Sequence, residues 1–422
     1  MSVNNIKKRI KKEGLISAGA YYGFKIINKV SESIARIFVK SDDSNIIVFK
    51  NRQGQDFSDN ARALFEYMMK KKMNKKYQIV WLVSKPSQFK HKKYSNVKFV
   101  KAETKHGFNS IRAYYYANKA KFFFYTNNTA CLNKHHIKEQ CIVNLWHGCG
   151  YKGSTHKNKG IKYNPYMEAF DYALVPGEIF VDLKANYWEC DKDKILPLGY
   201  PRYDWFNDKV SKMDVLGKMF DKQDISADDK LVLWMPTFRK TNTINTFAEG
   251  EIEFNFGIPL IESVEQLKKL NKLCEEKHIM LLIKRHPIAA RWIIGSKYSK
   301  IKFIDDNTLE KNDVLLYHLI RVSDALVSDY SSAAVDFMLL DRPIAFVLSD
   351  YEVYKKSRGF VFEDPQKYMP GDKLYQPKDL HQFIEAVAKG KDTYKDERKK
   401  LMPVMHNETK CYSERIVEYL NL

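Results

Sequence analysis

Apolar residues recur along the chain in two patterns, short continuous runs and stripes at helical spacing. Short runs rich in β-branched and aromatic residues predict buried strands, whereas stripes at intervals of three and four residues predict amphipathic helices. In the first half of the chain we expect strands at residues 46–49, 77–83, 97–100, 121–125, 141–146 and 172–176, and helices at 59–71 and 111–120. Strands that alternate with helices predict a parallel sheet covered by helices on both faces.

The alternation restarts after a polar interval at residues 209–228. Apolar runs typical of strands begin at Lys230, Ile279, Ile301, Ala325 and Pro343, and helices are expected at residues 263–277, 313–322 and 332–340. We therefore expect an α/β protein with two doubly wound domains that face each other across a cleft. The N-terminal domain would cover residues 43–208, residues 209–228 would connect the domains, and the C-terminal domain would cover residues 229–422.

Residues 1–42 precede this alternation and predict a basic amphipathic helix. Phe24, Ile27, Val30, Ile34 and Phe38 lie at helical spacing behind the basic stretch "IKKRIKK". Such a stripe either packs on the protein itself or contacts a bilayer, and neighbouring lysines and arginines suit an anionic membrane surface. We interpret the segment as a membrane contact.

Length and charge narrow the function classes. A chain of 422 residues, 44% of them hydrophobic, is long enough for more than one core, because single cores stop growing near ~250–300 residues. The formal net charge of +20 favours anionic partners: nucleic acid, an acidic membrane surface, a nucleotide or a polyphosphate. Charge alone does not distinguish among these partners.

Cysteine spacing and the lack of targeting signals suggest where the protein resides. The six cysteines show neither C-x-x-C spacing nor the density of a disulfide scaffold, which favours a reducing compartment and argues against structural zinc. We find no secretory signal and no apolar run of ~18 residues. The sequence thus predicts a protein of the cytoplasm, or one attached peripherally to the cytoplasmic face of the cell membrane.

His147 follows the expected strand at residues 141–146, in the stretch "NLWHGCGYKG". The carboxyl ends of strands in open α/β sheets face the ligand crevice, and Gly148 and Gly150 would let the backbone approach a substrate closely. His147 is therefore either a histidine that faces a ligand or a core histidine in a tight turn.

Other polar residues follow strands in the second half. Thr237 and Arg239 follow one strand, Arg285 and His286 follow another, and Asp329, Ser331 and Ser332 precede an apolar helix. Arginine grips phosphate oxygens in bidentate fashion, and the free amides of a helix N-terminus attract anions, so these residues together predict a diphosphate site. Taken singly, the arginines are typical of a solvated surface, and one serine is typical of an ordinary helix N-cap.

The motifs "WHGCGYKG", "GYPRYD", "PTFR", "KRHP", "SDYSSAAVDFMLLDRPIAF" and "RGFVFED…MPG" stand in this order, with "GQDFSDNARALFEYM" near the start. From about Ile46 to the C-terminus this set resembles the CDP-glycerol glycerophosphotransferases of bacterial teichoic acid synthesis. The resemblance implies a GT-B fold, in which two Rossmann-like domains enclose a cleft and the C-terminal domain holds the nucleotide donor. It also implies transfer of glycerol phosphate from CDP-glycerol to a hydroxyl of a polyprenyl-diphosphate-linked saccharide or growing polymer, with release of CMP.

The resemblance also implies roles for individual residues. His147 would be the general base for the acceptor hydroxyl, and His286 is the second residue that we expect to be catalytic. The residues expected to bind substrate come from five of these motifs: Lys152, Arg202, Thr237, Arg239, Arg285, Asp329, Ser331 and Ser332. Tyr203 departs from the pattern, because asparagine is expected at its position in "GYPRYD".

The predicted reaction requires neither a metal nor a cofactor, and the "DKD" stretch at residues 191–193 is typical of a solvated loop. Two other enzyme classes remain open, a GT-B glycosyltransferase and a transferase that uses CDP-ribitol. A basic nucleic-acid-binding protein is the alternative outside enzymes. We expect no nucleic-acid partner, because the aromatic residues lie within apolar strand and helix patterns and no recognised binding motif is present.

Overall fold

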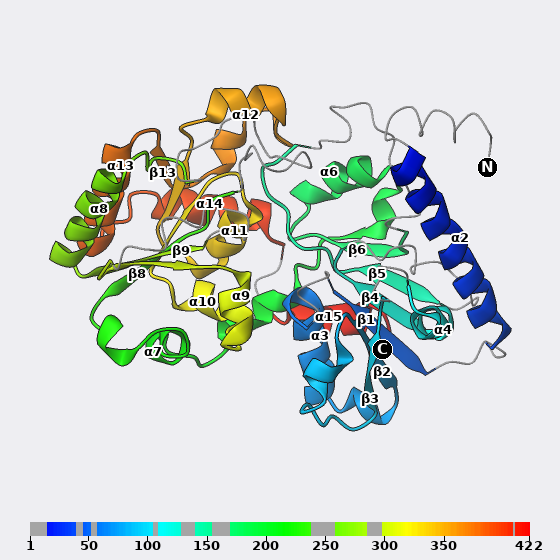
Figure 1. The fold of residues 1–422 in the computed structure, drawn as a ribbon. Coiled ribbons are helices and arrows are strands. Elements are labelled where there is room, and N and C mark those ends of the chain that lie inside the picture. Colours follow the sequence, from blue (N-terminus) through cyan, green and yellow to red (C-terminus); the bar gives the residue numbers. More distant parts are fainter. Residues whose placement is uncertain are drawn as a thin grey trace. The chain divides into compact units, whose positions relative to one another are not determined.

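The computed structural model describes residues 15–38, 45–51, 57–103, 109–127, 140–153, 169–237, 258–284, 298–407 and 410–422. The chain divides into two compact units (Figure 1). Unit 1 consists of Met1–His147 and Asn164–Leu174, and unit 2 consists of Gly148–Tyr163 and Val175–Leu422. Residues 175–208, which the sequence pattern groups with the N-terminal half, thus pack within unit 2.

The first sheet is built around hydrophobic strands with the order β3-β2-β1-β4-β5-β6-β7. Its strands are β1 (Ile46–Lys50), β2 (Gln78–Val83), β3 (Val97–Lys101), β4 (Phe122–Tyr125), β5 (Cys141–Asn144), β6 (Tyr172–Leu174) and β7 (Ile195–Leu196). The pairs from β3 to β6 are parallel, with Ile47 beside Ile79 and Phe122. All residues of β1 and β4 are buried, which explains why these strands read as continuous apolar runs.

The helices of unit 1 are α2 (Leu15–Ile37), α3 (Asp59–Lys70) and α4 (Ile111–Lys119) in the part that the structure describes. Helix α2 packs along α4 and buries Asn28, Glu32 and Ala35. Asn28 Oδ1 accepts hydrogen bonds from the Asn109 amide and the Tyr114 hydroxyl. A polar and small-residue face therefore attaches α2 to unit 1.

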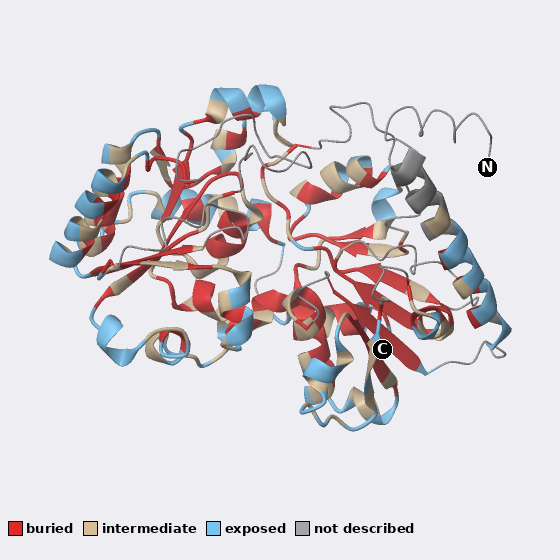
Figure 2. Ribbon diagram, viewed as in Figure 1, coloured by how far each residue is buried: buried red, intermediate tan, exposed pale blue. Residues whose placement is uncertain are grey.

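The apolar stripe expected on this helix lies on its exposed side. The exposed fractions are 42% for Ile27, 52% for Val30, 38% for Ile34 and 63% for Phe38, whereas the side chain of Phe24 lies outside the described residues. The described side chains of the stripe thus do not pack in the interior of unit 1 (Figure 2).

The second sheet has six parallel strands in the order β10-β9-β8-β11-β12-β13. Its strands are β8 (Lys230–Trp234), β9 (Ile279–Lys284), β10 (Ile301–Ile304), β11 (Ala325–Ser328), β12 (Ile344–Val347) and β13 (Asp372–Leu374). Both sheets follow the Rossmann order 3-2-1-4-5-6, in which the order reverses between the first and fourth strands of each sheet. The predicted doubly wound strand order is therefore present in both halves.

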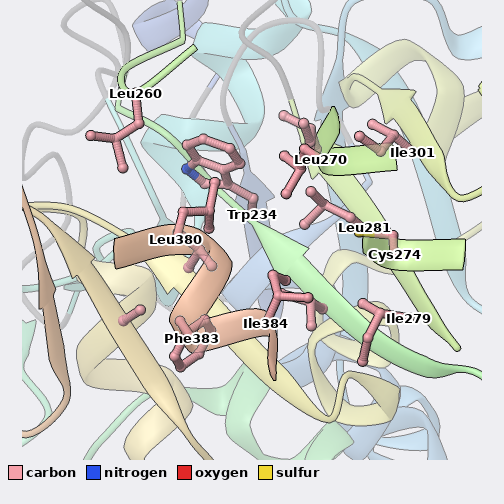
Figure 3. Close-up of a cluster of buried hydrophobic side chains, with 14 of the residues drawn as sticks. Trp234, Leu260, Leu270, Cys274, Ile279, Leu281, Ile301, Leu380, Phe383 and Ile384 are labelled. Atoms are coloured by element: carbon pink, nitrogen blue, oxygen red, sulfur yellow. The ribbon is translucent and has the colours of Figure 1, made fainter. Parts of the chain in front are cut away.

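The helices described in unit 2 are α6 (Ile179–Trp188), α7 (Lys212–Leu216), α8 (Val264–Glu276), α9 (Asp306–Lys311), α10 (Leu316–Val322), α11 (Ser332–Phe337), α12 (Tyr351–Ser357), α13 (Pro377–Ala388), α14 (Lys395–Met405) and α15 (Tyr412–Tyr419). Helices α8 and α13 bury Leu270, Cys274 and Phe383 in one cluster with Trp234 of β8 and Leu281 of β9 (Figure 3). Burial raises the pKa of the Cys274 thiol to about 12, so Cys274 acts as a small apolar side chain.

Candidate functional site

The strand that leads to His147 is shorter than its sequence predicts. We expected a strand through Trp146, but β5 ends at Asn144 because Trp146 adopts the left-handed backbone conformation, with φ at 51°. The side-chain amide of the buried Asn60 donates hydrogen bonds to the carbonyls of Leu145 and Trp146, at 3.0 and 2.9 Å. These two carbonyls therefore belong to a turn held by α3.

His147 is exposed, and its ring is held from one side. Its Nδ1 lies 3.2 Å from the backbone oxygen of Thr126, directly after β4. A carbonyl oxygen only accepts hydrogen bonds, so Nδ1 carries the proton, and in the neutral ring the lone pair is on Nε2. This is the tautomer in which Nε2 can act as a general base.

The glycines after His147 lie against the start of α11, within unit 2. A Cβ added at Gly148, whose φ is +134°, would lie 2.3 Å from Ser332 Oγ. A Cβ added at Gly150 would lie 2.7 Å from the Ser332 backbone nitrogen. Only glycine permits this close approach. The chain passes from unit 1 to unit 2 between His147 and Gly148, so the "WHGCG" motif belongs to both.

Lys152 lies further along the same motif and forms an isolated antiparallel bridge with Phe360. Gly153 adds a backbone hydrogen bond of 2.9 Å to the Gly359 carbonyl. The structure thus joins two of the motifs, "YKG" and "RGF", which are about 200 residues apart. The side chain of Lys152 is half-buried.

Thr237 and Asp329 meet where the strand order of the second sheet reverses. Thr237 follows β8 and Asp329 follows β11, and both side chains are buried. Asp329 accepts a hydrogen bond of 2.7 Å from the Thr237 backbone amide and another from the Thr237 hydroxyl. Two predicted site residues are thereby brought together, and the carboxylate holds Thr237, the second residue of the "PTFR" motif.

Ser331 and Ser332 begin helix α11. Ser331 is the N-cap, with its Oγ accepting a 3.4 Å hydrogen bond from the Ala333 amide, and Ser332 is the first helical residue. The ordinary capping role that the sequence left open is therefore present for Ser331. Helix α11 is only six residues long and continues as a 3-10 turn at Met338–Leu340.

Arg202 is buried in unit 2 with a carboxylate partner that the sequence pattern did not single out. Its side chain is 3% exposed, and its guanidinium lies 2.8 Å from Asp336 Oδ2. The hydroxyls of Tyr203 and Tyr317 also donate to Asp336. Burial, reinforced by the Asp336 charge, raises the pKa of the Tyr203 phenol, which keeps it protonated as a donor. Tyr203 thus has a structural reason to replace the expected asparagine.

Asp336 had one weak signal in the sequence, because it is the only charged residue within the apolar helix segment at 332–340. Buried carboxylates are seldom left without donors, so such a position points to a buried partner. The identity of that partner, 134 residues earlier in the chain, had no local signal.

Three predicted site residues, Arg239, Arg285 and His286, lie outside the described residues. The described ranges end shortly before them, at Thr237 and Lys284. Lys284 Nζ forms a 2.6 Å ion pair with Asp306, the first residue of α9.

The described histidines, cysteines and carboxylates form neither a metal-ligand cluster nor a disulfide. Over the described ranges, the structure contains no group of three or more His, Cys, Asp and Glu residues that could hold a metal ion. Cys141, Cys149, Cys190, Cys274 and Cys411 are free thiols, and Cys131 lies outside the described residues. The Asp191–Asp193 stretch is exposed, with Lys192 forming a 2.6 Å ion pair to Asp182.

The fold class is that of α/β proteins with two parallel sheets of Rossmann order, and Thr237 and Asp329 meet at the switch point of the second sheet. The family model for CDP-glycerol:poly(glycerophosphate) glycerophosphotransferase matches residues 33–422. The chain therefore belongs to this family of transferases, which confirms the resemblance seen in its motifs, and it is an enzyme of the glycerophosphotransferase class.

Known relatives agree with this family. The chain is 28% identical to a teichoic acid poly(glycerol phosphate) polymerase of Bacillus spizizenii, over 84% of this chain and 86% of that protein. It is 27% identical to a teichoic acid glycerol-phosphate transferase of Staphylococcus aureus, over 87% and 86% of the two chains. A solved structure of the wall teichoic acid polymerase TagF matches with a TM-score of 0.69 at 18% identity, covering 100% of this chain and 98% of that one. The last comparison shows a shared fold.

Proposed function

We propose that this enzyme transfers glycerol phosphate from CDP-glycerol to a hydroxyl of a polyprenyl-diphosphate-linked saccharide or of a growing teichoic acid-type polymer. The observation that carries this proposal is the family match across residues 33–422. The names of the relatives in B. spizizenii and S. aureus, which describe glycerol-phosphate polymerisation and transfer, support the same reaction.

In the proposed step, the acceptor oxygen attacks the phosphorus that carries glycerol. The bond from that phosphorus to the bridging oxygen breaks, and CMP leaves with the bridging oxygen. The acceptor proton passes to Nε2 of His147. The hydrogen bond from Nδ1 to the Thr126 carbonyl supports this role, because it leaves the lone pair of the neutral ring on Nε2.

For the donor, we propose that unit 2 binds the diphosphate through Arg239, Arg285 and His286, together with Ser331, Ser332 and Lys152. Phosphoryl transfer depends on positioning and on stabilising charge spread over the phosphate oxygens, which arginines supply. Thr237 and Asp329 would act by fixing the backbone two residues before Arg239. Arg202 would act through Asp336, since its guanidinium is buried against that carboxylate.

A GT-B arrangement, with unit 1 for the acceptor and unit 2 for the donor, is part of this proposal. The Rossmann order that the first six strands of each sheet share supports it.

Transfer from CDP-ribitol is the second candidate. The chain is 28% identical to a teichoic acid ribitol-phosphate primase of Bacillus spizizenii, over 67% of this chain and 70% of that protein. Relatives with different named polyols match this chain at similar identity, so identity does not separate the two donors.

The deciding experiment incubates the full chain with CDP-glycerol, or separately with CDP-ribitol, and a synthetic polyprenyl-diphosphate-linked disaccharide. Mass analysis of the lipid product distinguishes one added unit, as expected of a primase, from a ladder, as expected of a polymerase. A product formed from CDP-ribitol but not from CDP-glycerol would identify ribitol phosphate as the transferred group. No product from either donor would overturn the proposal.

We further propose that α2 attaches the enzyme to the cytoplasmic face of an anionic membrane. No helix in the described ranges is long and apolar enough to cross a bilayer. The exposed Ile27, Val30 and Ile34 on α2, with Phe38 directly after it, instead suit a helix that lies in the interface, and the basic stretch at residues 6–12 precedes it in the sequence.

The double variant Val30→Asp/Ile34→Asp tests this attachment. Removing two aliphatic side chains from the interface and adding negative charge should lower binding to vesicles with anionic lipids by more than about tenfold. Val264→Asp is the matched control, because Val264 is 44% exposed on a helix of unit 2. Flotation with and without anionic lipid measures both variants. Equal vesicle binding by the double variant and wild type would contradict the attachment.

A further inference from the structure

The segment "FSDNARALFEYM", which includes the start of α3, lies within the range that the family model matches, yet the proposed reaction assigns it no role. In the structure its first residues approach the turn before His147. Asn60 is fully buried in the first turn of α3 and donates to the carbonyls of Leu145 and Trp146. Asn60 precedes Leu145 by 85 positions in the chain and Trp146 by 86 positions.

The turn that Asn60 holds is strained. Trp146 has φ at 51°, a left-handed conformation that costs a non-glycine residue about 1–2 kcal/mol. Such a conformation persists only when its surroundings fix it, and it is concentrated at functional sites. Here the Trp146 amide donates to Asn144 Oδ1 at 2.9 Å, while its carbonyl accepts from Asn60. The peptide groups on both sides of the Trp146 Cα are therefore held by buried asparagine side chains.

The ring of His147 is held by a second set of contacts that also reaches α3. The Thr126 carbonyl accepts from His147 Nδ1, and the Thr126 hydroxyl donates to Asn51 Oδ1. The Asn51 amide donates to the backbone oxygen and to Oγ of Ser58, the N-cap of α3, at 2.7 and 3.0 Å. The first turn of α3 thus holds both the backbone before His147 and the loop that accepts from its ring.

We propose that Asn60 is a positioning residue for His147. By holding the left-handed turn at Trp146, it directs the imidazole so that Nδ1 meets the Thr126 carbonyl and the lone pair of the neutral ring is on Nε2. The catalytic consequence rests on the proposed function of His147 as general base, whereas the ring orientation does not. Asn60 itself touches no reacting atom in this scheme.

The test compares Asn60→Ala with Asn118→Ala. Asn118 lies in α4 of the same unit and is also fully buried, so its variant controls for loss of a buried asparagine. Both proteins are labelled with ¹⁵N-histidine, and the His147 ring signals are assigned from their absence in His147→Gln. The ¹⁵N shifts report the tautomer, single-turnover rates report the chemistry, and titration with CDP-glycerol reports donor binding.

We expect Asn60→Ala to lose the Nδ1-protonated preference and to slow the chemical step by about 100-fold, with donor affinity within twofold of wild type. Asn118→Ala should retain the wild-type tautomer and rate. If Asn60→Ala does not fold, Asn144→Ala loosens the same turn from its other side, and the same results are expected. A wild-type tautomer in a folded variant of either residue, with a rate equal to that of Asn118→Ala, would overturn the proposal.

The tautomer measurement separates this proposal from the general-base assignment. If Asn60→Ala changes the tautomer while His147→Gln transfers glycerol phosphate at the wild-type rate, the positioning of the ring stands. Only the assignment of His147 as the base then fails.

Discussion

The two sheets share one strand order, yet the loops at their switch points are joined by different chemistry. In unit 1 the Thr126 hydroxyl donates to the neutral amide oxygen of Asn51. In unit 2 the hydroxyl and backbone amide of Thr237 donate to the carboxylate of Asp329. The neutral Asn51 amide holds the Thr126 loop without placing a charge near the His147 ring. A nearby charge would favour one protonation state of that imidazole, which the Thr126 carbonyl orients. The buried carboxylate of Asp329 accepts stronger hydrogen bonds than an amide oxygen does. Its burial is costly, however, if any of its donors is lost.

The same contrast between neutral and charged partners is found in the contacts of Asn60 and Arg202. Unit 1 holds the turn before His147 with the uncharged Asn60, whereas unit 2 holds η4 (Pro201–Asn207) against α11 with the Arg202–Asp336 ion pair. Removing one member of a buried ion pair leaves an uncompensated charge, whereas removing a buried amide leaves unpaired dipoles. We therefore expect loss of the Asn60 contact to appear mainly in chemistry and loss of the Arg202–Asp336 pair mainly in stability.

The largest expected effect is on the chemical step, through His147→Ala in unit 1. Loss of a general base should slow this step by about 100- to 10,000-fold while affinity for CDP-glycerol stays near the wild-type value. Single-turnover rates and calorimetric titration measure the two quantities. His278→Ala is the control, because the His278 side chain is 78% exposed in unit 2. A sharp fall in melting temperature together with lost donor binding would identify His147 as a structural residue instead.

The next effect is on stability, through Asp336→Ala in unit 2. The Arg202 guanidinium and two tyrosine hydroxyls would lose their acceptor in a buried place, which should lower the free energy of unfolding by about 3–5 kcal/mol. Denaturant unfolding measures the change. Asp182→Ala breaks an exposed ion pair with Lys192 and should cost less than about 1 kcal/mol. Similar losses in the two variants would contradict the structural role of the buried pair.

A smaller effect compares the two switch-point contacts directly. Thr237→Val removes a donor to the buried carboxylate of Asp329 and should cost about 1.5–3 kcal/mol, because hydrogen bonds to charged groups are the stronger ones. Thr126→Val removes a donor to the neutral Asn51 oxygen and should cost about 0.5–1.5 kcal/mol. Denaturant midpoints rank the two variants. A larger loss for Thr126→Val would reverse the proposed contrast between the units.

The smallest effect depends on pH and concerns His406, which donates from Nε2 to the Val335 carbonyl of α11 at 2.9 Å. Burial lowers the pKa of His406 below its usual 6.5. The unfolded chain then binds the proton first, so His406 makes stability fall as pH drops through about 6.5, by up to about 1.4 kcal/mol per pH unit. His406→Gln should flatten this slope in melting curves between pH 7.5 and about 5.5, whereas His278→Gln should keep it. An unchanged slope in His406→Gln would exclude this contribution.

Part of the site was predictable because its signals are local. Glycines beside His147 predicted a close approach by the backbone, although the expected neighbour was a substrate and the structure places Ser332 there. Thr237 and Asp329 follow β8 and β11, which pair in parallel, so their meeting at one edge follows from the strand order. The roles of Asn60 and Asp336 were not predictable, because nothing near a buried polar residue in the sequence identifies a partner far away in the chain.

The sequence by itself determined the alternation of strands and helices, the regions of all described strands except β7 and β13, and the family. These features depend on local periodicity and on ordered motifs, which short stretches of residues carry without reference to distant ones. Only the tertiary structure decided that β5 stops at Asn144, that α2 buries Asn28 and Glu32 while exposing its apolar stripe, and that the units divide between His147 and Gly148. Those outcomes depend on hydrogen bonds and packing between positions tens of residues or more apart, and such contacts leave no periodic signal in the sequence.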